Sequence, residues 1–107
     1  MKRGSVWWVE FDPAIGSEIH KTRPAVIVSN DTANKYLARV VVVPLTSNVS
    51  RVYPGEAIVT VNGNKSKAMT DQIMSADKSR LQEKIGEFSR NDMISLESAM
   101  KSFLDLL

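Results

Sequence analysis

Two apolar, β-branched segments limit the possible folds of this chain more than any other feature. They are Ala25–Ser29 and Arg39–Leu45, and four consecutive valines, Val40-Val41-Val42-Val43, lie within the second. Short, continuous apolar runs with polar residues on both sides are typical of strands in the middle of a sheet. Because neither run alternates with polar side chains, we expect both faces of these two strands to be buried.

Other segments have strand character and are joined by short polar connections. Ser5–Phe11 is rich in valine and tryptophan and ends at Asp12-Pro13, which favours a turn. Asn62-Gly63-Asn64 tolerates the positive φ angles of a tight hairpin, so it predicts a turn between the strands Glu56–Val61 and Lys67–Ser75. The remaining expected elements are a short helical piece in 31–36, a brief helical turn in 79–81 and a last strand, Lys84–Phe88.

The C-terminal segment has helical rather than strand periodicity. Ser89 followed by Asp92 has the spacing of a capping box, with aspartate in place of the usual glutamate. Apolar residues then recur every three or four positions, which predicts an amphipathic helix packed on the sheet. They are Met93, Leu96, Met100, Phe103 and Leu107, with Ile94, Leu104 and Leu106 widening the stripe. Many short strands with one terminal helix predict a mainly β fold with helices (α+β), namely a small, strongly curved antiparallel barrel.

Length and composition set further limits. At 107 residues the chain is expected to be a single domain, residues 1–107, with one core. It contains no cysteine, so neither a disulfide nor a thiolate zinc site can form. The net charge of +2 permits nucleic-acid binding without indicating it. No apolar stretch is long enough for a signal peptide or a membrane span, so we expect a soluble, cytoplasmic protein without a membrane partner.

A polar loop leads directly into the first buried strand. Between Glu18 and Arg23 it carries a carboxylate, the only histidine of the chain (His20), Lys21 and the arginine itself. Side chains from a loop that is fixed to a strand are well held, which suits charge-assisted contacts to phosphate. A second polar element, Pro44–Asn48, follows the next apolar run. Two strands that end near each other would bring Arg23 and Thr46 into one site.

Four motifs, in this order and spacing, resemble the signature of the MazF/PemK toxins, the ribonuclease halves of bacterial toxin–antitoxin pairs. The resemblance extends from about residue 2 to the C-terminal helix. The motifs are Gly4–Val9, Gly16-Ser17-Glu18 with Thr22–Val28, Val43–Ser47 and Thr70–Ile73. The resemblance implies an SH3-like barrel of the MazF/CcdB type with appended helices, and a homodimer. It also implies inhibition by a cognate antitoxin, whose acidic, partly disordered tail would fold across the RNA groove.

The resemblance implies an endoribonuclease that cuts single-stranded RNA, chiefly messenger RNA, at a specific sequence without metal or other cofactor. In this reaction the 2′-hydroxyl attacks the neighbouring phosphorus and leaves a 2′,3′-cyclic phosphate and a 5′-hydroxyl. The sequence is compatible with it, since Asp71 and Asp77, six positions apart and without a histidine, are a poor metal signature.

Three residues are the candidates for catalysis. Arg23 offers a planar fork of donors that stays charged, so it suits the developing phosphorane charge, with a second role as acid left open. Thr46 has a stiff side chain whose hydroxyl can donate to a non-bridging oxygen. Glu18 would either accept the 2′-hydroxyl proton or orient Arg23. The structural alternatives are an ion pair of Arg23 with Glu18 or Glu10, and a bond from the Thr46 hydroxyl to the local backbone.

The candidate RNA contacts surround these three residues: Ser17, His20, Lys21, Ser47, Asn48, Asp71 and Gln72. One branch of the MazF/PemK family uses a loop histidine that matches Ser17 here, together with an arginine at the position of Met69. Both departures favour the arginine–threonine version of the mechanism and make His20 an RNA contact. Asp71 and Gln72 are expected to shape the substrate groove or the dimer seam.

Trp7 and Trp8 are adjacent on a predicted strand and must point to opposite faces. At most one of them is expected to line a groove, and the other belongs to the core or to a dimer interface. The loops Ser47–Gly55 and Asn62–Ser66 are the expected readers of RNA bases. Two other functions stay open: a gyrase-poisoning toxin of the CcdB type on the same barrel, and a non-catalytic RNA-binding module.

Overall fold

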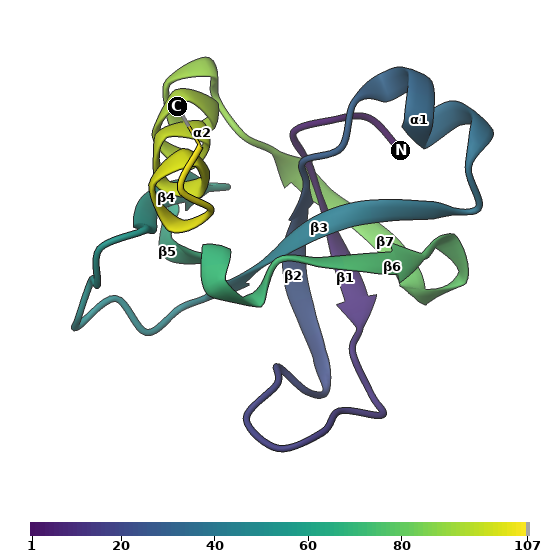
Figure 1. Cartoon of the computed structure of the whole chain (residues 1–107), viewed down its shortest axis with the longest axis horizontal. Helices are drawn as coiled ribbons and strands as arrows, with labels where there is room; N and C mark the ends of the chain where they lie inside the picture. The colour runs from purple at the N-terminus through teal and green to yellow at the C-terminus, as the bar shows by residue number, and fades with distance from the viewer. Residues whose placement is uncertain (107) are drawn as a thin grey trace.

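A computed structural model describes residues 1–106, in which a curled antiparallel sheet of seven strands is accompanied by two α-helices (Figure 1). The strands are β1 (Ser5–Glu10), β2 (Thr22–Ile27), β3 (Arg39–Thr46), β4 (Glu56–Val61), β5 (Asn64–Met69), β6 (Met74–Asp77) and β7 (Leu81–Glu87). The helices are α1 (Asp31–Tyr36) and α2 (Arg90–Phe103), and two 3₁₀ turns are η1 (Thr70–Gln72) and η2 (Lys78–Arg80). The predicted mainly β fold with a C-terminal helix is confirmed.

Strand order explains why the sheet curls. The hydrogen-bonded order is β4-β5-β3-β2-β1-β7, and β6 pairs with β3 off this path. The N-terminal half of β3 pairs with β6 and its C-terminal end pairs with β5, while β2 lies along its other edge. One long central strand therefore belongs to both halves of the sheet, and its twist carries the edge β4–β5 hairpin away from β1 and β7 (Figure 1).

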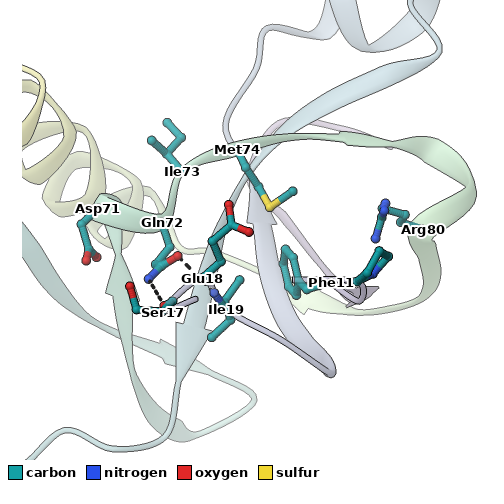
Figure 2. A pocket seen from close by; sticks show the side chains of 10 residues that line it. Phe11, Ser17, Glu18, Ile19, Asp71, Gln72, Ile73, Met74 and Arg80 are labelled. Atoms are coloured by element: carbon teal, nitrogen blue, oxygen red, sulfur yellow. Dashed lines mark hydrogen bonds between the residues drawn. The ribbon is translucent and has the colours of Figure 1, made fainter. Parts of the chain in front are cut away.

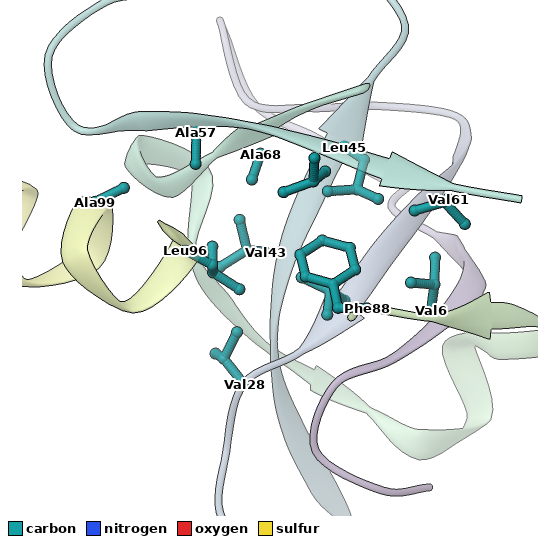
Figure 3. Close-up of a cluster of buried hydrophobic side chains, with 12 residues drawn as sticks. Val6, Val28, Val43, Leu45, Ala57, Val61, Ala68, Phe88, Leu96 and Ala99 are labelled. Carbon is teal, nitrogen blue, oxygen red and sulfur yellow. The ribbon is translucent and has the colours of Figure 1, made fainter. Parts of the chain in front are cut away.

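Both faces of the central strands are buried, as their apolar sequences predict. On one face Val26 and Val43 pack with Leu96 of α2 in the larger core cluster (Figure 3). On the other face Ala25 and Val42 belong to a second cluster, which includes Val9, Ile27, Val40, Ala76 and Leu81. Because neighbouring residues of a strand alternate between faces, an uninterrupted apolar run is what a sheet with a core on each side requires.

Helix α2 begins as predicted but buries a narrower stripe. The Ser89 hydroxyl accepts the amide of Asp92 at 3.1 Å, whereas the Asp92 carboxylate accepts the amide of Thr60 in β4 at 3.0 Å and ties the helix to the sheet. Leu96 and Ala99 are buried, but Ile94, Phe103, Leu104 and Leu106 are exposed, so the wide stripe is wrong. Leu107 lies outside the described residues. No helix within residues 1–106 has the length and apolar character to cross a membrane.

The predicted strand Lys67–Ser75 is wrong, because the chain divides there into β5, η1 and β6. β5 begins directly after the predicted turn, where Asn62 and Gly63 have φ angles of 51° and 80°. β5 pairs with β3 on one side of Pro44 and β6 pairs with β3 on the other, so the break at η1 lies beside this proline. Proline has no backbone N–H that could donate to a neighbouring strand. Within η1, the Thr70 hydroxyl donates to the carbonyl of Gly55.

Three other boundaries shift by a few residues. β2 begins at Thr22 rather than Ala25, and β7 begins at Leu81 rather than Lys84, while β3 extends to Thr46. The first shift matters most for function, because it moves Arg23 from the polar loop into a strand.

Candidate active site

Strand pairing places Arg23 and Thr46 together. Arg23 lies in β2 opposite Val9 of β1, and Thr46 is the last residue of β3. β2 and β3 are antiparallel with Ala25 opposite Pro44, and the same register continued by two residues sets Arg23 opposite Thr46. Their proximity therefore follows from sheet register, which is a firmer constraint than the conformation of a loop.

A pocket of about 370 Å³ surrounds these two residues, and we call it the Arg23 pocket. Its lining residues are Trp8, Lys21, Thr22, Arg23, Pro24, Leu45, Thr46, Ser47 and Ser66. Four predicted site residues, Lys21, Arg23, Thr46 and Ser47, are thus brought together as expected. Lys21 has a positive φ of 66°, and its amide donates to the Asp12 carboxylate at 3.1 Å. That bond fixes the point where the loop enters β2.

The two tryptophans separate as the strand alternation predicts. Trp8 is 38% exposed and lines the Arg23 pocket. Trp7 packs against the second core cluster, and its indole N–H donates to the Ser5 hydroxyl at 3.0 Å. One aromatic face is therefore available beside Arg23, and the other stabilises the fold.

The Arg23 guanidinium has no acidic partner within residues 1–106, since no carboxylate in that range forms a salt bridge with it. Its Nε donates to the carbonyl of His20 at 3.3 Å. Glu10 accepts the Thr22 hydroxyl at 2.9 Å, and Glu18 accepts the amide of Ile15 at 2.7 Å. The alternative in which Arg23 pairs with Glu18 or Glu10 is therefore wrong. The catalytic part of Glu18 stays a prediction.

The Thr46 hydroxyl does bond the local backbone, but as an acceptor. Its Oγ1 receives the amide of Asn48 at 3.3 Å, which leaves the hydroxyl proton able to donate to another group. Asn48 in turn accepts the amide and the hydroxyl of Ser50, at 3.3 and 2.7 Å. Asn48 shapes the turn after β3 and does not line the Arg23 pocket.

Four other predicted residues line a second pocket of about 420 Å³, which we call the loop pocket (Figure 2). It lies between the β1–β2 loop and η1, and its lining includes Ser17, Glu18, Asp71 and Gln72. The Gln72 side chain accepts the amide of Ile19 at 3.2 Å and donates to the carbonyl of Ser17 at 3.4 Å, the two bonds drawn in Figure 2. His20 is exposed and lines neither pocket. The polar loop therefore serves two pockets, not one.

Arg80 is a lining residue that the sequence analysis missed. Its Nη1 donates to the carbonyls of Glu10 and Asp12, at 2.9 and 2.8 Å, and so fixes the base of the β1–β2 loop. It lies at the end of η2, where no motif of the sequence marks it. Only the approach of η2 to the end of β1, across about seventy positions of sequence, gives Arg80 this role.

Among residues 1–106, the carboxyl groups of Asp77 and Glu87 have a shifted pKa, and neither lines either pocket. Hydrogen bonds from the Ser79 hydroxyl and amide lower the pKa of Asp77. The Lys84 ammonium lowers the pKa of Glu87 through a hydrogen bond of 2.7 Å. Among residues 1–106, no group of three histidine, aspartate or glutamate side chains is arranged to hold a metal ion.

Comparisons with known proteins agree with one another. Residues 2–104 match the PemK-like, MazF-like toxin family of type II toxin–antitoxin systems. A relative from Mycobacterium tuberculosis (strain ATCC 25618 / H37Rv), named Endoribonuclease MazF9, is 43% identical over 115 residues, which cover 99% of this chain and 98% of the relative.

Two solved structures have the same fold. MazF (Form-I) from Deinococcus radiodurans has a TM-score of 0.87 at 25% identity, over 99% of this chain and 97% of that one. An endoribonuclease in complex with its cognate antitoxin, from Mycobacterial species, has a TM-score of 0.85 at 25% identity, over 100% of this chain and 97% of that one.

Proposed function

The chain belongs to the PemK-like, MazF-like toxin family of type II toxin–antitoxin systems, and we propose that it is a sequence-specific endoribonuclease toxin. Its substrate is single-stranded RNA, chiefly messenger RNA, and the cut requires no metal ion. The relative at 43% identity carries the name of an endoribonuclease, which favours this function over a gyrase poison or a non-catalytic RNA-binding module. Residues 1–107 form one toxin domain in this proposal.

The observation that carries the proposal is an arginine without an acidic partner in the described chain, set beside a threonine hydroxyl in one pocket. The guanidinium fork of Arg23 binds two non-bridging oxygens of the scissile phosphate, and the Thr46 hydroxyl donates to one of them. Both contacts strengthen as charge develops on the phosphorane, so they stabilise the transition state more than the substrate.

The reaction joins the 2′-oxygen to phosphorus and breaks the bond from phosphorus to the 5′-oxygen. The 2′-hydroxyl loses its proton to a base, and the leaving 5′-oxygen takes up a proton, which gives a 2′,3′-cyclic phosphate and a 5′-hydroxyl. The Arg23 guanidinium acts as stabiliser and can donate a hydrogen bond to the leaving oxygen, which takes its proton from water. Glu18 holds its own loop through the Ile15 amide, and we propose that the base is a separate group.

The other candidate residues contact the RNA on either side of the scissile phosphate. Lys21 and Ser47 act in the Arg23 pocket, and Ser17, Asp71 and Gln72 act in the loop pocket. His20 and Asn48 contact the strand outside the pockets. The toxin acts in the cytoplasm as a homodimer. Because one neighbour in fold is an endoribonuclease with its cognate antitoxin, we propose a cognate antitoxin for this chain too, with an acidic tail that covers the RNA groove.

The test is a digest of a long, unstructured RNA with purified protein in excess EDTA, followed by primer extension and analysis of the new ends. We expect discrete cuts at one short motif, with a cyclic phosphate and a 5′-hydroxyl. Arg23→Ala purified in parallel must leave the RNA intact, which excludes a contaminating nuclease. Intact RNA from the folded wild-type protein would contradict the proposal, and double-strand breaks in plasmid incubated with gyrase would then establish the gyrase poison.

A further inference from the structure

A lysine with a largely buried side chain lies next to the Arg23 pocket but does not line it. Lys67 belongs to β5, directly opposite Thr46 of β3, and is only 9% exposed. Its Nζ donates to the carbonyl of Arg51 at 3.0 Å and forms an ion pair with Glu56 at 3.3 Å. The same ammonium lies 5.6 Å from the centre of the Tyr53 ring. Every one of these partners belongs to the segment Ser47–Gly55 or to the residue that follows it.

Glu56 completes the same attachment. Its carboxylate accepts the amide of Tyr53 at 2.7 Å, and its own amide donates to the Tyr53 carbonyl at 3.0 Å. The Thr70 hydroxyl donates to the carbonyl of Gly55, the last residue of the loop. The end of the Ser47–Gly55 loop is thus fixed by polar contacts to β5 and η1, with Lys67 at their centre.

Although Lys67 is buried against the loop backbone, the side chains of the loop remain exposed. Val52 and Tyr53 are about half exposed, and Arg51 donates to the Tyr53 hydroxyl at 3.4 Å while remaining exposed itself. The loop therefore presents an aromatic ring and a guanidinium to solvent on a fixed backbone. Such groups stack on unpaired bases and bind the RNA backbone. The loop begins at Ser47, which lines the Arg23 pocket, so bases next to the scissile phosphate would meet it.

The Lys67–Glu56 ion pair is much more buried than the second lysine–glutamate pair of the protein, Lys84–Glu87. Lys84 and Glu87 lie 2.7 Å apart, but their side chains are 46% and 64% exposed, against 11% for both Lys67 and Glu56. An exposed pair contributes little to stability and can be lost at small cost. A buried charge must be desolvated, and loss of its partner leaves the other charge unpaired. Lys67 is therefore held in place strongly enough to fix the loop backbone.

We propose that Lys67 is a positioning residue that holds the Ser47–Gly55 loop in the shape that reads RNA bases, and that it thereby sets the cleavage motif. This inference rests on the proposed endoribonuclease function. Lys67 does not touch the reacting atoms, because its ammonium is occupied by Arg51, Glu56 and Tyr53. Arg23 is placed by its pairing with Val9 and Thr46 by the backbone pairing of β3 with β5, so the chemistry itself does not depend on the loop or on the Lys67 side chain.

The test compares Lys67→Met with the matched control Lys84→Met, each assayed on the RNA motif that the wild-type enzyme cuts and on its single-base variants. For Lys67→Met we expect the ratio of kcat/KM between preferred and altered motifs to fall about tenfold, with kcat on the preferred motif within about threefold of wild type. Hydrogen exchange of the Tyr53 amide should rise in the same variant without RNA. Lys84→Met should change neither quantity, and Lys67→Arg should keep most of the selectivity because it restores the cation.

If Lys67→Met fails to fold, the double variant Lys67→Met/Glu56→Gln removes both buried charges and takes its place. It still lacks the bond to the Arg51 carbonyl, so the loss of selectivity should persist. An unchanged selectivity ratio, or a Tyr53 amide that stays protected, would overturn the inference while the enzyme still cuts RNA. A wild-type protein that cuts no RNA would overturn the proposed function, and this inference with it.

Discussion

The Arg23 pocket and the loop pocket share one polar loop but are built differently. The Arg23 pocket lies where two paired strands end, and its polar lining consists of cations, hydroxyls and backbone. The loop pocket lies between the β1–β2 loop and a 3₁₀ turn, and its lining includes the carboxylates of Glu18 and Asp71. The one cation of that lining, Arg80, donates to the carbonyls of Glu10 and Asp12, and the two carboxylates repel a phosphodiester, so the Arg23 pocket suits the scissile phosphate better. Charges that look like one site in the sequence therefore divide into two sites of different charge.

The difference also concerns how firmly each group is held. Arg23 is fixed by the pairing of β2 with β1, and Thr46 by the pairing of β3 with β5, while the β2–β3 register sets the two residues opposite each other. In the loop pocket, the loop is fixed by single contacts, chiefly those of Gln72 and Arg80. Catalytic groups need the firmer support, whereas groups that select a substrate tolerate adjustment. Substitutions in the two pockets should therefore differ in size and in kind.

The largest effect is expected from Arg23→Ala. Loss of the fork that binds the phosphorane oxygens should lower kcat by about 10³-fold, as removal of a preorganised donor does elsewhere. Circular dichroism and the melting temperature should stay near wild type, because Arg23 makes one weak hydrogen bond to His20. Arg80→Ala is the matched control in the other pocket and should act mainly on KM. Equal losses of kcat in the two variants would break the distinction between the pockets.

Thr46→Val should have a smaller effect on the same step. Valine keeps the branched shape and removes one neutral donor, worth about 0.5–1.5 kcal/mol, so kcat should fall up to about tenfold. Thr46→Ser retains the hydroxyl and should keep most of the activity. Single-turnover rates on the preferred RNA would measure both. A Val variant as fast as wild type would show that the Thr46 hydroxyl, including its bond with the Asn48 amide, contributes nothing to the rate.

Glu18→Gln is expected to have the smallest effect. Glutamine keeps an oxygen that can accept the Ile15 amide but removes the negative charge and the basicity. We expect kcat to stay within about threefold of wild type, whereas loss of a general base would cost about 10²–10⁴-fold. The dependence of kcat on pH should also be unchanged. A large loss of kcat, together with loss of the plateau that kcat reaches at alkaline pH, would show that the loop moves Glu18 next to the substrate during catalysis.

Part of this protein follows from the sequence alone. Val40, Val42, Val43 and Ala25–Ile27 are buried, and Val41 is half-buried, because a continuous β-branched run fits no other place in a small domain. Asn62-Gly63 sets the hairpin and Ser89 caps α2, since each acts on atoms within three residues of itself. The meeting of Arg23 and Thr46 was also predictable, because it needs only two neighbouring strands that end at the same edge.

Other features depend on contacts between residues far apart in the sequence, and only the tertiary structure decided them. Glu18 lies in the loop pocket because Gln72, more than fifty positions away, holds that loop. The break at η1 and the exposure of Phe103 depend in the same way on which segment packs alongside. Lys67 looks like any surface lysine in the sequence, and it becomes buried only when the Ser47–Gly55 loop folds over it. Residue type and spacing determine local structure. Which loop side chains face a pocket is determined by contacts with residues that are far away in the sequence.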